Sequence, residues 1–355
     1  MLDTVKLCVP YKDCIINSPE IFSPCVTPSI KRGTKCICNP DKYWMGMGKY
    51  FPKLTVLKGY DKELNLFIEF SAPKLLFGNN FDELESSDFG KVIDELLDRL
   101  MGYDIEISRK NLENAKVVSI HYSKNFDLEN TNAICLTKII EKLDISKRLD
   151  IAKTDYRNGG QIVRFHTNSY EVAFYDKVAD LKQSIISEKR ALENYNLIQQ
   201  DLLSKLKGRE VLRMEVRLNK GRKIKSILEK CKINLDILSF KNLFNTNISK
   251  KILNYFWDEF IEKSIYVVCQ SENDNNVILS KCALSGFSQQ KTLKIAGIMA
   301  TIKNNGCRYI KEQIKNAGFN KYVKDIELLN LEDNYILKQF RDIRAKLQRM
   351  IPLRI

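Results

Sequence analysis

The chain has 355 residues, of which 44% are hydrophobic and 29% charged, and it carries a formal net charge of +14. This length is enough for two domains, and the composition is that of a folded soluble protein, which excludes a disordered or fibrous chain. The excess of lysine and arginine is spread over both halves of the chain, so it indicates a polyanionic partner, either nucleic acid or an acidic membrane surface.

The sequence contains no apolar run long enough to cross a bilayer, since the longest one, at 295–302, is bounded by Lys294 and Lys303. The N-terminal residues lack the apolar stretch of a secretory signal peptide, so we expect a cytoplasmic protein without a membrane partner. The ten cysteines are then reduced thiols. Cys36 and Cys38 lack the second pair or the nearby histidines of a structural zinc site, and we interpret both as plain thiols.

The first 245 residues alternate between strands and helices. Period-two alternation predicts strands at 4–9, 53–59, 64–71, 116–123, 161–166, 170–177 and 211–219. Asn168 and Ser169 form the turn of a hairpin between two of these strands. Apolar spacing of three and four residues predicts one helix that starts near Ser87 or Asp88 and a second at 135–143. A third, long and polar helix is predicted at 178–206.

The remainder of the chain is helical in pattern. Helical spacing is found at 249–266, 288–304, 308–317, 320–330 and 334–350. We therefore predict an α+β domain with a largely antiparallel sheet at 1–245 and a helical domain at 246–355. The short helices separated by Asn-Gly and Ala-Gly pairs are typical of helix-turn-helix units and of plain bundles alike, so both interpretations stay open.

Alternation also predicts which side chains share a face of each strand. Arg213, Glu215 and Arg217 lie opposite an apolar row, so we expect Glu215 on a solvent or cleft face between two arginines. If the strands belong to one sheet, this face collects His121, His166, Tyr175, Lys177 and Glu215. Asp176 points the other way and is expected to cap the following helix. The simpler alternative is a surface row of salt bridges with a packing tyrosine.

These residue types suit phosphoryl transfer to a tyrosine. Histidine and glutamate are suitable ligands for a divalent cation, which would polarise a phosphate. The hydroxyl of Tyr175 can act as a nucleophile, and Lys177 can stabilise phosphate charge or lower the pKa of the tyrosine. The DNA backbone would contact the neighbouring basic residues Arg164, Arg213 and Arg217.

Four segments follow the order and style of one family: MLDTVKLCVP at 1–10, IEFSAPKLLFGNN at 68–80, EVAFYDKVADLKQ at 171–183 and EVLRMEVRL at 210–218. They resemble the replication initiators of filamentous phages, of the gene II and X type, and related phage and plasmid replication proteins. The resemblance extends over most of the chain, including QQKTLKIAGIMATIKNNG at 289–306. Members of this family start rolling-circle replication by nicking one strand at an origin, and they become joined to its 5′ end through a tyrosine.

The resemblance implies a role for individual residues. Tyr175 corresponds to the nucleophile and Lys177 to its neighbouring lysine, while Glu215 stands in the place of a metal ligand. The strand that usually presents an acidic residue has His121 here, a departure that leaves the ligand set open. A related superfamily uses a His-hydrophobic-His pair, which this sequence lacks, so Glu215 and His121 rank above His166 as ligands of Mg²⁺ or Mn²⁺.

The resemblance thus implies a Rep nickase-like catalytic domain that acts on double- and single-stranded origin DNA with a host helicase and polymerase. Tyr170, Tyr156 and Tyr122 are reserve nucleophiles. The main alternative is a non-catalytic origin-binding or copy-control protein. A tyrosine recombinase is disfavoured because the second arginine of its Arg-His-x-x-Arg set is missing after His166, and a membrane-surface protein is favoured by net charge alone.

Overall fold

The computed structural model describes residues 1–27, 29–40, 49–59, 63–143, 149–155, 161–188 and 193–355. Its centre is a nine-stranded sheet in the order β3-β4-β5-β1-β7-β11-β10-β9-β8, with every neighbouring pair antiparallel. In chain order its strands are β1 (Leu2–Pro10), β3 (Lys35–Cys38), β4 (Lys53–Lys58), β5 (Leu64–Ser71), β7 (Lys116–Leu128), β8 (Asp150–Asp155), β9 (Gln161–His166), β10 (Tyr170–Asp176) and β11 (Glu210–Leu218). The predicted α+β class with a largely antiparallel sheet is confirmed.

A second, two-stranded sheet pairs β2 (Cys14–Ile16) with β6 (Ile105–Ile107). The helices before the predicted boundary are α2 (Ala72–Phe77), α3 (Phe89–Met101), α4 (Arg109–Glu113), α5 (Ala133–Glu141), α6 (Lys177–Glu188), α7 (Glu193–Lys205), α8 (Gly221–Lys230) and α9 (Phe240–Leu243). Those after it are α10 (Thr246–Trp257), α11 (Ile265–Ser271), α12 (Asn275–Leu284), α13 (Gln289–Leu328) and α14 (Tyr335–Arg349).

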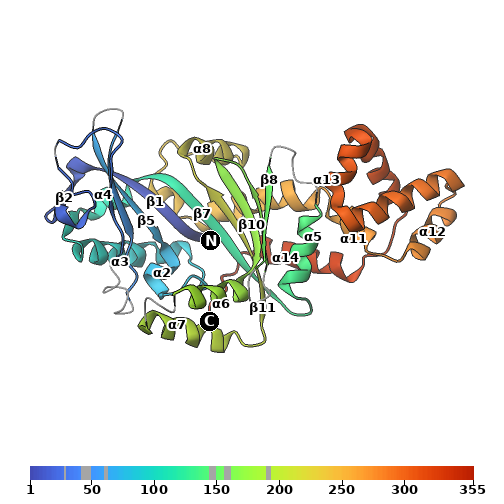
Figure 1. The fold of residues 1–355 in the computed structure, drawn as a ribbon, viewed down its shortest axis with the longest axis horizontal. Helices are drawn as coiled ribbons and strands as arrows, with labels where there is room; N and C mark the ends of the chain where they lie inside the picture. Colours follow the sequence, from blue (N-terminus) through green and yellow to red (C-terminus); the bar gives the residue numbers. More distant parts are fainter. Residues whose placement is uncertain (28, 41–48, 60–62, 144–148, 156–160, 189–192) are drawn as a thin grey trace.

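The predicted long helix at 178–206 is wrong. The structure has two helices here, α6 and α7, which pack against each other below the sheet (Figure 1). Val178 and Leu181 of α6 share a small apolar cluster with Leu202 of α7 and with Phe81. The segment was correctly predicted to be helical, but helical spacing alone does not show where a chain reverses.

The hydrophobic core runs across the predicted boundary at 245. Helix α10 packs against β7 and β11, and α14 packs against α10 and β7. The ring of Trp257 lies 6.3 Å from Phe126 of the sheet and 6.3 Å from Phe340 of α14. Residues 246–355 therefore share one core with the sheet, while α11, α12 and α13 extend to one side of it (Figure 1).

Helix α13 contains the segments that were predicted as three helices. Gly306 has a φ of +81°, which an α-helix does not have, so the helical axis breaks there, close to the predicted Asn-Gly break. Residues 308–328 are helical throughout, so the predicted break at Ala317 and Gly318 is wrong. In the part of the chain that the structure describes, no helix is long and apolar enough to cross a membrane.

Candidate active site on the polar face of the sheet

Polar side chains form three rows across the central strands β7, β11, β10 and β9. Directly paired residues of antiparallel strands project to the same side of the sheet. The outer row is His121, Arg217, Glu171 and His166; the middle row is Ser123, Glu215, Ala173 and Arg164; the inner row is Asn125, Arg213, Tyr175 and Ile162. The prediction that His121, His166, Tyr175 and Glu215 share one face of one sheet is confirmed. The other face of these strands is apolar and covered by α8, α10 and α14.

Tyr175, Glu215, Arg217 and His121 form one hydrogen-bonded network. The hydroxyl of Tyr175 donates to Oε2 of Glu215 at 2.9 Å. Nε of Arg217 donates to Oε1 of the same carboxylate at 2.8 Å, and Nδ1 of His121 lies 3.4 Å from Oε1. Tyr175 is 5% exposed and Glu215 is 3% exposed. Glu215 was expected on a solvent or cleft face between two arginines; the solvent alternative is wrong, because the side chain is buried.

The surroundings of the network shift the pKa values of Tyr175 and Glu215 in opposite directions. Burial, reinforced by the Glu215 carboxylate, raises the pKa of the Tyr175 hydroxyl well above 10. Burial works against ionisation of Glu215, but Arg217, His121 and Arg213 hold its pKa well below the usual range. Tyr175 is therefore a protonated donor at neutral pH, and Glu215 is the ionised acceptor of its hydrogen bond.

Arg217 and Arg164 are the basic groups of the outer and middle rows. Arg217 is 29% exposed and bridges two carboxylates, with Nη1 3.0 Å from Oε1 of Glu171. Arg164 is half-buried, and its Nη2 donates to the hydroxyl of Thr154 at 2.9 Å. We call the end of the polar face that carries the outer row its open end, because Arg217 there is partly exposed. An anion at this end could contact both guanidinium groups.

Arg213 was predicted to contact the DNA backbone from the surface, and this location is wrong. The side chain is 2% exposed and forms an ion pair with Asp3 at 2.9 Å. It also donates to Oγ of Ser123 at 2.8 Å and to the carbonyl of Asn80 at 2.9 Å. Arg213 therefore joins distant segments of the chain inside the protein.

The loop that follows α2 covers the inner row of the polar face. Helix α2 ends at Gly78, whose φ of +73° favours glycine. The side-chain oxygen of Asn79 accepts hydrogen bonds from the backbone N–H groups of Phe81 and Asp82, both at 2.9 Å. The carbonyl of Phe81 accepts from the side chain of Asn125 at 2.7 Å. The SAPKLLFGNN segment thus ends in a turn that covers the inner row.

Lys177 was predicted to be the last residue of a strand, but it is the first residue of α6. Its side chain is fully buried, with Nζ 5.8 Å from the centre of the Tyr175 ring and 2.8 Å from Oδ2 of Asp180. Burial lowers the pKa of the lysine. Asp176 accepts the backbone N–H of Ala179 at 2.9 Å, so its predicted capping role is confirmed.

Glu215 and His121 are the two residues that would hold Mg²⁺ or Mn²⁺. One carboxylate and one imidazole are suitable, because these ions keep several water or phosphate ligands. His166 lies in the same row as His121 but on β9, with Arg217 and Glu171 between them. Among the described residues, no three side chains of His, Cys, Asp or Glu are grouped closely enough to form a full cage.

The reserve tyrosines are placed less favourably than Tyr175. Tyr122 is fully buried on the apolar face and donates to the carbonyl of Leu243 at 2.9 Å. Tyr170 also lies on the apolar face, 4.0 Å below Nζ of Lys223. Tyr156 lies outside the described residues.

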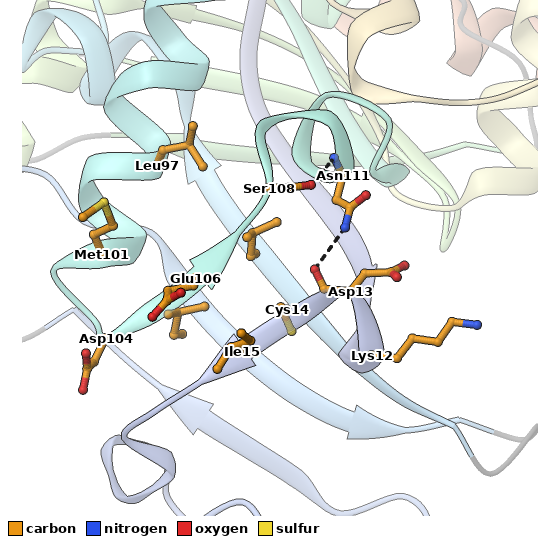
Figure 2. A pocket seen from close by; sticks show the side chains of 12 residues that line it. Lys12, Asp13, Cys14, Ile15, Leu97, Met101, Asp104, Glu106, Ser108 and Asn111 are labelled. Carbon is orange, nitrogen blue, oxygen red and sulfur yellow. Dashed lines mark hydrogen bonds between the residues drawn. The ribbon is translucent and has the colours of Figure 1, made fainter.

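A separate cavity of about 730 Å³ lies between α3 and the small sheet of β2 and β6 (Figure 2). Asp13, Asp104 and Glu106 line it, and Nδ2 of Asn111 donates to the carbonyl of Asp13 at 3.2 Å. None of the candidate site residues lines this cavity. Its acidic side chains make it unsuitable for a polyanion.

Comparisons with protein-family models, with curated proteins and with solved structures found no match. Sequence reasoning had already assigned Tyr175, Glu215 and His121 to one face. It missed Asp3 and Asn125, because nothing in their spacing links them to β11.

Proposed function

We propose that this protein is a metal-dependent DNA nickase and strand transferase that initiates rolling-circle replication, with Tyr175 as the nucleophile. The observation that carries this proposal is the 2.9 Å hydrogen bond from the Tyr175 hydroxyl to Glu215, beside Arg217 and His121. The resemblance of four sequence segments to filamentous-phage initiators supports the same tyrosine. The net charge of +14 supports a DNA substrate.

The chemistry follows from the positions of these groups. A phosphodiester at the open end of the face contacts Arg217 and Arg164, which offset its negative charge. Mg²⁺ or Mn²⁺ held by Glu215 and His121 supplies polarisation of the phosphate when bound. The bond from Tyr175 Oη to phosphorus forms, the tyrosine proton passes to water, and the bond from phosphorus to O3′ breaks. After O3′ takes a proton from water, the products are a 3′-hydroxyl and a 5′-phosphotyrosine.

DNA binding must also uncover Tyr175, which is 5% exposed. Arg217 is the group whose movement would do so, because it covers Glu215 and is itself the more exposed residue. A substrate phosphate competes with Glu171 and Glu215 for this guanidinium and draws it toward solvent. The hydroxyl of Tyr175 is then open to the phosphodiester.

The test uses labelled single-stranded and supercoiled DNA covering the genetic element that encodes the chain. Wild-type protein should nick the plasmid and form an adduct that survives boiling in detergent, with loss of both on addition of EDTA. Tyr175→Phe should abolish nicking and the adduct while sparing DNA binding, and mass spectrometry should locate the DNA on Tyr175. Tyr170→Phe is the matched control and should keep activity. Undiminished nicking by Tyr175→Phe would remove Tyr175 from this role.

The second candidate is a non-catalytic origin-binding protein. The burial of Tyr175 and the raised pKa of its hydroxyl favour this alternative, since a protonated and covered tyrosine is a poor nucleophile. Tight DNA binding without any covalent adduct, in the presence of Mg²⁺ or Mn²⁺, would decide in its favour.

A further inference from the structure

Helix α8 presents a strongly basic surface. The segment NKGRKIKSILEKCK at 219–232 contains one carboxylate, Glu229, and six cations: Lys220, Arg222, Lys223, Lys225, Lys230 and Lys232. Ile224, Ile227 and Leu228 are buried against the sheet, so the basic side chains lie on the outer side of the helix. We call the exposed Lys220, Arg222 and Lys225 the α8 basic face.

These cations are not neutralised within the protein. In the ranges that the structure describes, none of the six forms an ion pair, whereas Arg213, Arg217 and Lys177 are each tied to a carboxylate. Lys230 only donates to the hydroxyl of Tyr255, at 3.4 Å. Desolvation and the charge of Lys230 lower the pKa of Lys223.

The α8 basic face begins just after the end of β11 that carries Arg217, although the helix packs on the apolar face of the sheet, opposite the candidate active site. Lys220 follows Arg217 by three residues, so their Cα atoms are at most about 11 Å apart. The backbone N–H of Asn219 donates to the carbonyl of Ser169 at 3.0 Å, which holds the start of α8 against the β9–β10 hairpin. Phosphates along α8 would therefore lead to the strand end that carries Arg217 and Glu171.

We infer that the α8 basic face binds the phosphate backbone of the duplex DNA that flanks the reacting strand. The inference rests on the proposed function for the position of the reacting strand, but not for binding itself. A membrane surface fits less well, because an interfacial helix exposes apolar residues beside its basic ones, and those of α8 are buried. The contacts are with phosphates, so binding through α8 does not depend on DNA sequence.

The experiment measures binding of a labelled 20-base-pair duplex of arbitrary sequence by fluorescence anisotropy, in EDTA, over a range of salt concentrations. Lys220→Gln/Arg222→Gln/Lys225→Gln is compared with Lys53→Gln/Lys91→Gln/Lys110→Gln, which removes the same charge from exposed lysines on β4, α3 and α4. Each lost phosphate contact reduces the slope of log K against log salt by about 0.9. We expect the α8 variant to lose about 2 to 3 from this slope and at least about tenfold in affinity at low salt, while the control changes by less than about twofold.

Equal losses in the two triple variants would overturn the inference, since they would show an effect of net charge alone. No loss in the α8 variant, or α8-dependent binding of phosphatidylserine vesicles in place of the duplex, would also overturn it. Circular dichroism of both variants checks that they fold. Because the assay contains EDTA and needs no cleavage, failure of Tyr175 to form an adduct would leave this result standing.

Discussion

The inner and outer ends of the polar face differ in how far their arginines, Arg213 and Arg217, are exposed to solvent. These arginines lie four residues apart on the same face of β11, and both contact carboxylates. At the inner end Arg213 is 2% exposed, covered by Asp3 and by the loop that contains Asn80. At the outer end Arg217 is 29% exposed and forms ion pairs with Glu215 of its own strand and with Glu171 of β10.

The difference teaches that one sequence pattern can produce a structural and a functional region in the same strand. A buried ion pair with additional hydrogen bonds joins chain segments and resists rearrangement. Arg217 is partly exposed, so an incoming phosphate can compete with Glu171 and Glu215 for its guanidinium group. Tyr175 lies in the inner row beside Arg213, and its hydroxyl donates to Glu215 of the middle row, which also contacts Arg217.

The largest expected effect is at the inner end. Arg213→Met removes the partner of Asp3 and the bonds to Ser123 and Asn80, leaving a buried carboxylate uncompensated. We expect a loss of about 3–5 kcal/mol in the free energy of unfolding, measured by urea denaturation. Arg217→Gln, the matched variant at the outer end, should lose less, about 1–3 kcal/mol, because the glutamine amide can still donate to Glu215, which also keeps its bond from Tyr175. Similar losses at both positions would mean that the two ends do not differ in this way.

A second prediction concerns the pH dependence of stability. Burial opposes ionisation of Glu215, but Arg217, His121 and Arg213 depress its folded-state pKa below that of the unfolded chain. The stabilisation is then fully present above the unfolded pKa of about 4.3 and is lost as the pH falls through the folded-state value.

Glu215→Gln removes this titration, so the stability difference between wild type and variant should shrink as the pH falls below about 4. Urea denaturation at a series of pH values measures it. A difference that stays constant from neutral to acid pH would contradict the proposed charge balance between the middle row and Arg217.

The smallest effect is expected at the junction of β10 and α6. Asp176→Ala removes the acceptor of the Ala179 N–H and should cost about 1 kcal/mol of stability. Because this cap positions Lys177 beside the Tyr175 ring, the variant should also alter Tyr175 fluorescence or its near-ultraviolet signal. Asp176→Asn, which retains an acceptor oxygen, should restore most of the stability, whereas equal losses in both variants would exclude a capping role.

Much of the sheet and of its polar face could be predicted from local patterns. Alternation correctly placed His121, Tyr175 and Glu215 on one side, because the side-chain period of a strand is set by its backbone. Strand β8 and helix α8 were not predicted, and the reversal between α6 and α7 was missed. Chain reversals and short exposed elements depend on contacts that lie far away in the sequence.

The sequence by itself determined the α+β class, the basic charge, and the set of residues that alternation brings to one face. Only the tertiary structure decided which of them are covered. Arg213 was expected beside DNA, but Asp3 and the loop after α2 pack over it. Lys177 was expected to stabilise phosphate charge, but it is buried at the start of α6 with Asp180. Burial results from packing between elements, whereas alternation is a local property of each strand.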